Sequence, residues 1–85
     1  MSSTVITDEQ AKKHIAANLA RLLKMQKISQ SELARRTGEA RMTIWRLCRG
    51  LNVPTAGVLA RIAEALGTSL DSLLEVPPKN SRRSA

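Results

Sequence analysis

Signals that begin and end helices recur at short intervals along this sequence, whereas strand signals are absent. Thr7 with Gln10, and Ser29 with Glu32, have the spacing of a capping box, in which two side chains bond free backbone groups at the start of a helix. Gly38 is a stop signal, because glycine readily adopts the left-handed conformation that ends helices. A chain with this pattern is predicted to be all-α.

The start and stop signals divide the chain into five expected helices, over residues 8–26, 30–37, 41–49, 56–66 and 70–75. Their large apolar residues recur at helical spacing and are expected to share one core: Ile15, Leu19, Leu22, Leu33, Ile44, Leu47, Leu59, Ile62, Leu66, Leu70 and Leu73. The predicted domain spans residues 8–76. It lies between a flexible start at residues 1–7 and a basic tail at residues 77–85, which is expected to be disordered.

Charge is distributed unevenly along the chain. Its 85 residues are enough for one domain and carry a net charge of +7, from 14 basic and 7 acidic residues. Ten of the basic residues lie between Lys12 and Arg49, where only Glu32 and Glu39 oppose them. This asymmetry predicts one basic surface on the first three-fifths of the chain, and it favours an anionic partner such as nucleic acid.

Residue types that catalysis or metal binding would need are scarce. No nucleophile, base and orienting group form a set and no glycine-rich phosphate loop occurs, so we expect no enzyme activity, cofactor or metal. His14 is expected at the surface or boundary, and Cys48 in the core or at its boundary, with a redox switch as the alternative for this thiol. No apolar run reaches the ~20 residues of a membrane span and no secretory signal is seen, so the expected location is the cytoplasm.

The segment "RMTIWRLCRG", from position 41 to 50, contains the only aromatic residue of the chain. On a helix that turns about 100° per residue, one face carries Arg41, Met42, Trp45, Arg46 and Arg49. The opposite face is core-like. Trp45 is therefore predicted to point outward among arginines, and the alternative is that it folds back over the domain. Such a face fits the DNA major groove, where arginine pairs with guanine and apolar groups contact the thymine methyl.

The run "SQSELARRTGEARMTIWRLCRGLNVPT", followed by "LARIAEALGTSLDSLL", resembles the helix-turn-helix domain of the lambda repressor/Cro family, also called the Xre family. The resemblance covers residues 15–74 without a gap. It implies a compact five-helix domain whose second and third helices form the helix-turn-helix, with the third in the major groove. The base-reading positions implied by the resemblance are Ala40, Arg41, Met42, Trp45 and Arg46, and the DNA-backbone positions are Gln30, Arg49 and Asn52.

Three residues depart from the pattern of this family. Glu39 occupies a turn position that is usually apolar, and Cys48 replaces a common glutamate. Ala40 replaces the usual Ser or Thr cap of the third helix, at a cost of about 1 kcal/mol of helix stability. For Glu39 we expect a contact with Arg36 or Arg41, or a favourable interaction with the start of the third helix.

The function that the resemblance implies is that of a bacterial or phage transcriptional regulator, with repression favoured, which binds a palindromic operator on double-stranded DNA as a homodimer. The dimer surface is expected at Leu70, Leu73, Leu74 and Val76, and the alternative places all these leucines in the core. A second interpretation is a protein-binding module, for example an antitoxin that neutralises a toxin and autoregulates its own operon. A membrane partner is not expected, and the cytoplasmic location implies association with the nucleoid.

Overall fold

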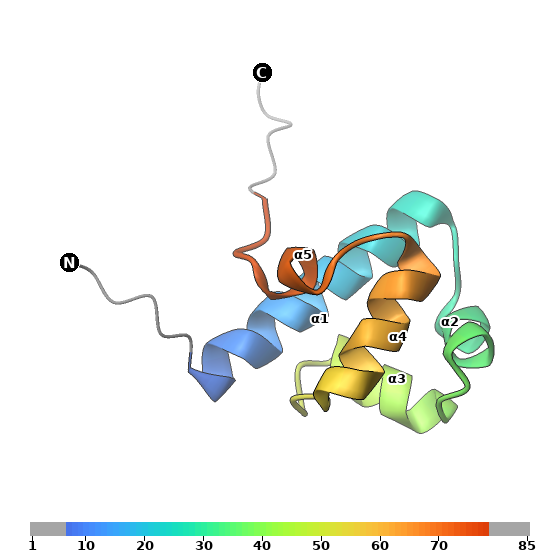
Figure 1. The fold of residues 1–85 in the computed structure, drawn as a ribbon, viewed down its shortest axis with the longest axis horizontal. Coiled ribbons are helices and arrows are strands. Elements are labelled where there is room, and N and C mark those ends of the chain that lie inside the picture. Colours follow the sequence, from blue (N-terminus) through green and yellow to red (C-terminus); the bar gives the residue numbers. More distant parts are fainter. Residues whose placement is uncertain (1–6, 79–85) are drawn as a thin grey trace, which may run out of the picture.

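Five helices account for most of residues 7–78, the part of the chain that the computed structural model describes. They are α1 (Asp8–Gln26), α2 (Gln30–Thr37), α3 (Arg41–Cys48), α4 (Ala56–Leu66) and α5 (Leu70–Leu74) (Figure 1). No strand occurs within this range, so the predicted all-α class is confirmed. Of the predicted flexible start at residues 1–7 and the predicted basic tail at residues 77–85, residues 1–6 and 79–85 lie outside the described residues.

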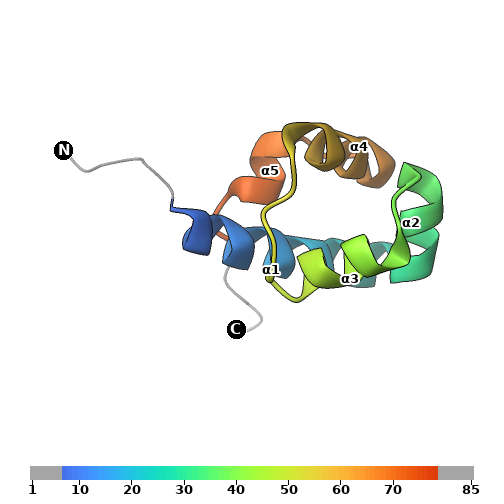
Figure 2. The ribbon, with the colours of Figure 1, turned by 90° about the horizontal axis from the view of Figure 1, so that it is seen from below.

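The helices form two layers that are closed at one end. Figure 2 shows α1 and α3 side by side in one layer and α4 and α5 in the other, and both pairs are in contact. α2 lies at the end of the layers, where it contacts α3 and α4. This arrangement leaves one side of α3 at the surface. No helix among residues 7–78 is long and apolar enough to cross a membrane.

The helix starts follow the local capping signals, except that the second predicted capping box is only half formed. The Thr7 hydroxyl accepts from the Gln10 backbone N–H at 3.1 Å, and the Gln10 side chain accepts from the Thr7 N–H at 3.0 Å, which completes the capping box. At α2 only half of the predicted box forms. The Ser29 hydroxyl accepts from the Glu32 N–H at 3.0 Å, but the Glu32 carboxylate binds two arginines on its own helix instead. Charge-assisted bonds to guanidinium groups are stronger than a bond to a neutral N–H, which explains the difference.

The core contains nine of the eleven apolar residues that periodicity predicts, all of them buried: Ile15, Leu19, Leu33, Ile44, Leu47, Leu59, Ile62, Leu66 and Leu73. Leu22 is partly buried against this cluster, and Leu70 is 38% exposed. Leu70 is the first residue of the five-residue helix α5 and lies at the edge of the fold. A single short helix that packs on one side cannot bury all of its leucines.

The predicted dimer surface needs a correction at Leu73. Its side chain is 0% exposed and belongs to the core, because α5 packs against α1 and α4 at this position. Leu74 is partly buried against the same core, whereas Leu70 and Val76 are exposed. The alternative that the leucines of this helix are core residues is therefore right for Leu73.

Polar side chains of α1 hold the end of α5. His14 is half-buried at the predicted boundary, with its ring Nδ1 3.0 Å from the Leu74 carbonyl oxygen. Asn18, which no pattern in the sequence singled out, is fully buried and donates to the carbonyl oxygens of Leu73 and Glu75. Arg21 in turn donates to the Asn18 side-chain oxygen at 3.2 Å. The two Asn18 bonds satisfy terminal carbonyl groups that a short helix cannot satisfy itself.

Candidate nucleic-acid interface

A three-residue turn, Gly38 to Ala40, joins α2 to α3 and sets the angle between them. Gly38 has a φ of 76°, in the left-handed region where a side chain would be strained, and its N–H donates to the Ala34 carbonyl at 2.9 Å. The same carbonyl accepts from the Glu39 N–H at 3.2 Å. These bonds end α2 abruptly and allow α3 to start in a new direction, so the predicted helix-turn-helix is present.

The Glu39 side chain binds α4 and not the residues predicted from the sequence. The Arg61 guanidinium donates to the Glu39 carboxylate at 2.7 Å, and the carboxylate side chain is only 18% exposed. The expected contacts with Arg36 or Arg41 are therefore wrong. Arg36 is held by Glu32, and the turn lies beside α4, which brings Arg61 within reach. The ion pair fastens the turn of the motif to the core.

The start of α3 is uncapped by any side chain. Ala40 is its N-cap residue and makes no side-chain hydrogen bond, as the substitution of alanine for the usual Ser or Thr predicts. No acidic residue lies in the first turn of α3. The first backbone N–H groups of this helix therefore have no acceptor from a capping side chain, which leaves them suited to an external anionic partner.

The two faces of α3 are separated as periodicity predicts. Ile44 and Leu47 are buried in the core, and Met42 and Trp45 are 55% and 41% exposed. All three arginines of the segment, Arg41, Arg46 and Arg49, are exposed. The prediction that the tryptophan points outward is confirmed, and the alternative that it folds back over the domain is wrong.

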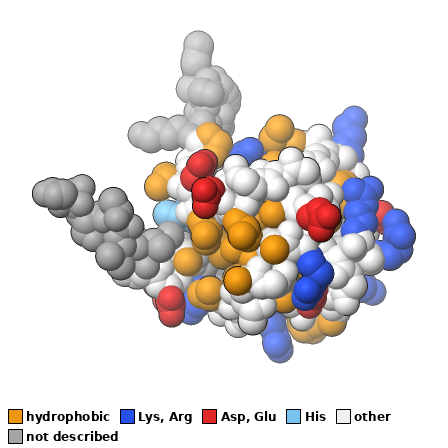
Figure 3. Space-filling model, in the orientation of Figure 1, with side chains coloured by type: hydrophobic (Ala, Val, Ile, Leu, Met, Phe, Trp, Pro, Cys, Tyr) orange, Lys and Arg blue, Asp and Glu red, His pale blue; other side chains and the backbone are white. Residues whose placement is uncertain are grey.

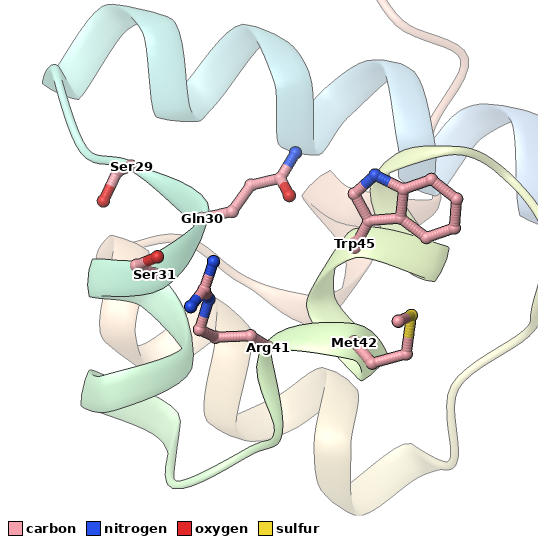
Figure 4. A pocket seen from close by; sticks show the side chains of 6 residues that line it. All are labelled: Ser29, Gln30, Ser31, Arg41, Met42 and Trp45. Atoms are coloured by element: carbon pink, nitrogen blue, oxygen red, sulfur yellow. The ribbon is translucent and has the colours of Figure 1, made fainter.

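The exposed face of α3 and the start of α2 border one surface cavity of about 530 Å³. Its lining residues come from both helices: Ser29, Gln30, Ser31, Arg41, Met42 and Trp45 (Figure 4). Figure 4 shows the Gln30 side chain extending from α2 across the gap toward Trp45. Four of the residues implied by the family resemblance thus share one cavity. Ala40, Arg46, Arg49 and Asn52 are exposed but do not line it.

The charges of α3 are not neutralised by neighbours. The ion pairs among residues 7–78 involve Lys12, Arg35, Arg36 and Arg61, and none involves the arginines of the α3 segment. Arg49 instead lies over the Trp45 ring, with its guanidinium carbon 5.2 Å from the ring centroid. Figure 3, in the orientation of Figure 1, shows Lys and Arg side chains gathered at the end of the molecule where α2 lies. Free guanidinium groups on α3 can donate to base edges or phosphates.

The chemistry of Cys48 argues against a redox switch. Burial raises the pKa of its thiol, and the side chain is only partly accessible. The reactive form of cysteine is the thiolate, which a raised pKa disfavours.

Within the described range, no three His, Cys, Asp or Glu side chains are grouped closely enough to hold a metal ion.

The fold and this face together define a DNA-binding domain with a helix-turn-helix motif. A family model described as helix-turn-helix matches residues 19–73, and the chain belongs to this family, the lambda repressor/Cro (Xre) type. Membership makes it a DNA-binding regulator and not an enzyme.

The chain is also similar to a solved structure, the crystal structure of hypothetical transcription factor NHTF from Neisseria, with a TM-score of 0.76. The similarity covers 91% of this chain and 88% of that chain at 23% sequence identity, and it shows the shared fold. No curated protein matches the chain at a significant level.

Proposed function

We propose that this protein is a sequence-specific transcriptional repressor that inserts α3 into the major groove of a palindromic operator as a homodimer. The observation that carries the proposal is the exposed face of α3, where Arg41 and Arg46 are free of ion pairs beside Met42 and Trp45. A protein that occupies an operator overlapping a promoter excludes polymerase, so repression is the simplest result. The site of action is the cytoplasm, on the nucleoid.

Within this proposal the residues divide into two groups. Ala40, Arg41, Met42, Trp45 and Arg46 contact base edges. Gln30, Arg49 and Asn52 contact the sugar-phosphate backbone and position α3. All eight side chains are exposed and are therefore free to contact DNA. Guanine offers O6 and N7 acceptors that match an arginine, and the small Ala40 allows the start of α3 to approach the groove closely.

A homodimer is proposed because one short helix reads only a few base pairs. The candidate residues for this contact are Leu70 and Val76, which are exposed, and Leu74, which is partly buried, on or just after α5, which packs against α1. Two copies joined through these residues would place their α3 helices on one side of the DNA. Half-site centres are then expected about 10–10.5 base pairs apart, one turn of the double helix.

Selection of bound duplexes from a random DNA pool tests the function. We expect an enriched palindrome, and sedimentation of the complex should show two chains per minimal operator. A variant with Arg41→Ala and Arg46→Ala should enrich nothing specific. Arg36→Ala removes the same kind of charge outside the cavity and serves as the matched control, which should return the wild-type site.

Failure would be recognised at two levels. A pool that shows no enriched sequence would refute sequence-specific binding. An enriched but asymmetric site with one chain at saturation would refute the dimer while leaving specific binding intact.

A further inference from the structure

The Trp45 ring is held from one side by the protein itself. Arg49, the C-cap residue of α3, follows Trp45 by about one helical turn, and its guanidinium carbon is 5.2 Å from the ring centroid. A cation over the face of an indole is attracted by the negative charge of that face. Trp45 also lines the cavity between α2 and α3.

Two apolar side chains therefore stand at the rim of an otherwise polar cavity. Met42 and Trp45 lie next to each other on α3, and the other lining residues carry hydroxyl, amide or guanidinium groups (Figure 4). In the major groove, the methyl group at carbon 5 of a pyrimidine is the main apolar feature of the base edges. Thymine carries this methyl, and 5-methylcytosine presents the same group at the same position.

We infer that Trp45 and Met42 form an apolar contact for a pyrimidine 5-methyl group in each half-site, beside a base bound by Arg41. The inference rests on the proposed function and names the chemical group that this part of α3 recognises. Arg49 covers the other face of the ring and is not itself part of this contact. Arg41 lines the same cavity, so the guanine that it suits lies next to the methylated pyrimidine.

The test removes only the methyl group. Each thymine of the selected operator is replaced in turn by deoxyuridine, and binding of the full chain is measured by titration. We expect one position per half-site at which the change weakens binding about fourfold. This is the loss of affinity expected when one buried methyl-sized group is removed. If that position is a cytosine, 5-methylation should instead strengthen binding about fourfold. The first result identifies thymine as the source of the methyl, and the second identifies 5-methylcytosine.

Protein variants link the methyl to Trp45. Trp45→Ala, checked for folding by its circular dichroism and melting curve, should bind methylated and unmethylated duplexes equally. Met42→Ala should partially reduce the ratio of the affinity for the methylated duplex to the affinity for the unmethylated duplex. Arg46→Ala, which lies outside the cavity, should weaken binding to both duplexes and keep the ratio.

Two results would overturn the inference while the proposed function stands. One is specific binding to an operator with an affinity that changes neither when any thymine is replaced by deoxyuridine nor when any cytosine is methylated at carbon 5. The other is a methyl effect that persists in the Trp45→Ala and Met42→Ala variants. Failure to select any operator would count against the proposed function instead.

Discussion

Asn18 on α1 joins the first helix to the last one through the carbonyl oxygen of Leu73, to which its side-chain nitrogen donates at 2.8 Å. The same nitrogen donates to the Glu75 carbonyl at 2.9 Å, and the side chain is 0% exposed. α5 has only five residues and ends without a glycine cap. The amide of Asn18 thus provides the donors that the end of this helix lacks.

Replacing Asn18 by alanine is therefore expected to lower the free energy of unfolding by about 1–3 kcal/mol, because buried carbonyl groups lose their donors. Urea unfolding followed by circular dichroism measures the change. Lys13→Ala, at an exposed position of the same helix, should change stability by less than about 0.5 kcal/mol. Equal stability of the two variants would show that water replaces the amide without cost.

Alanine at Arg41 or at Arg46 should each cost about 1–3 kcal/mol of operator binding and relax the preference at one position of each half-site. The physical reason is that each guanidinium is free of ion pairs on the exposed face of α3. Titrations of operator and random DNA measure both effects, with Arg36→Ala as the charge-matched control. An equal loss on both DNAs would reassign the arginine to the phosphate backbone.

Alanine at Gln30 or Arg49 should weaken operator and random DNA alike, because backbone contacts carry no sequence information. For Arg49→Ala, the slope of log affinity against log salt should also fall by about one unit per half-site. Titrations at several salt concentrations measure this slope. Arg49 would have no phosphate contact if the variant changed specificity and left the slope as it was.

Trp45 is the only aromatic residue, so intrinsic fluorescence reports on the α3 face alone. At 41% exposure the indole should emit as a hydrated ring and be quenched readily by iodide, and bound operator should reduce quenching. Trp45→Ala should weaken DNA binding and leave the melting temperature nearly unchanged. A large drop in melting temperature would point to a structural role, for which about 3–5 kcal/mol is typical.

Stability at low pH should depend on Glu32, because side-chain hydrogen bonds from Arg35 and then Arg36 lower its pKa from 4.5 to about 2. The folded pKa is below the unfolded one, so the contribution to stability is complete above about pH 4.5 and is lost as pH falls toward about 2. The wild type should therefore lose slightly more stability than Glu32→Gln between these values. The effect is small because the Glu32 side chain remains partly accessible to solvent, which screens its ion pairs. Urea unfolding at about pH 6 and about pH 3 tests this, and parallel losses would contradict it.

Local sequence determined at which residues the helices begin and end and which side of α3 faces outward. Thr7 and Gln10 are three residues apart, so the bonds that start α1 need no tertiary contact. The same holds for Gly38, whose left-handed conformation ends α2 through a bond to Ala34. Periodicity alone separated Ile44 from Trp45, because consecutive positions on a helix differ by about 100°.

Tertiary structure alone decided the contacts of those side chains for which the local sequence allowed several partners or indicated none. Glu39 had basic residues nearby in the sequence, yet it binds Arg61, 22 positions away, because α4 packs beside the turn. Asn18 meets Leu73 across 55 positions, and no local pattern marks it. Leu70 and Leu73 carry the same side chain on the same short helix, but only the packing of α5 on α1 and α4 buries Leu73 and leaves Leu70 at the edge. Capping and periodicity act within one turn of helix, whereas burial and ion pairing depend on which helices meet.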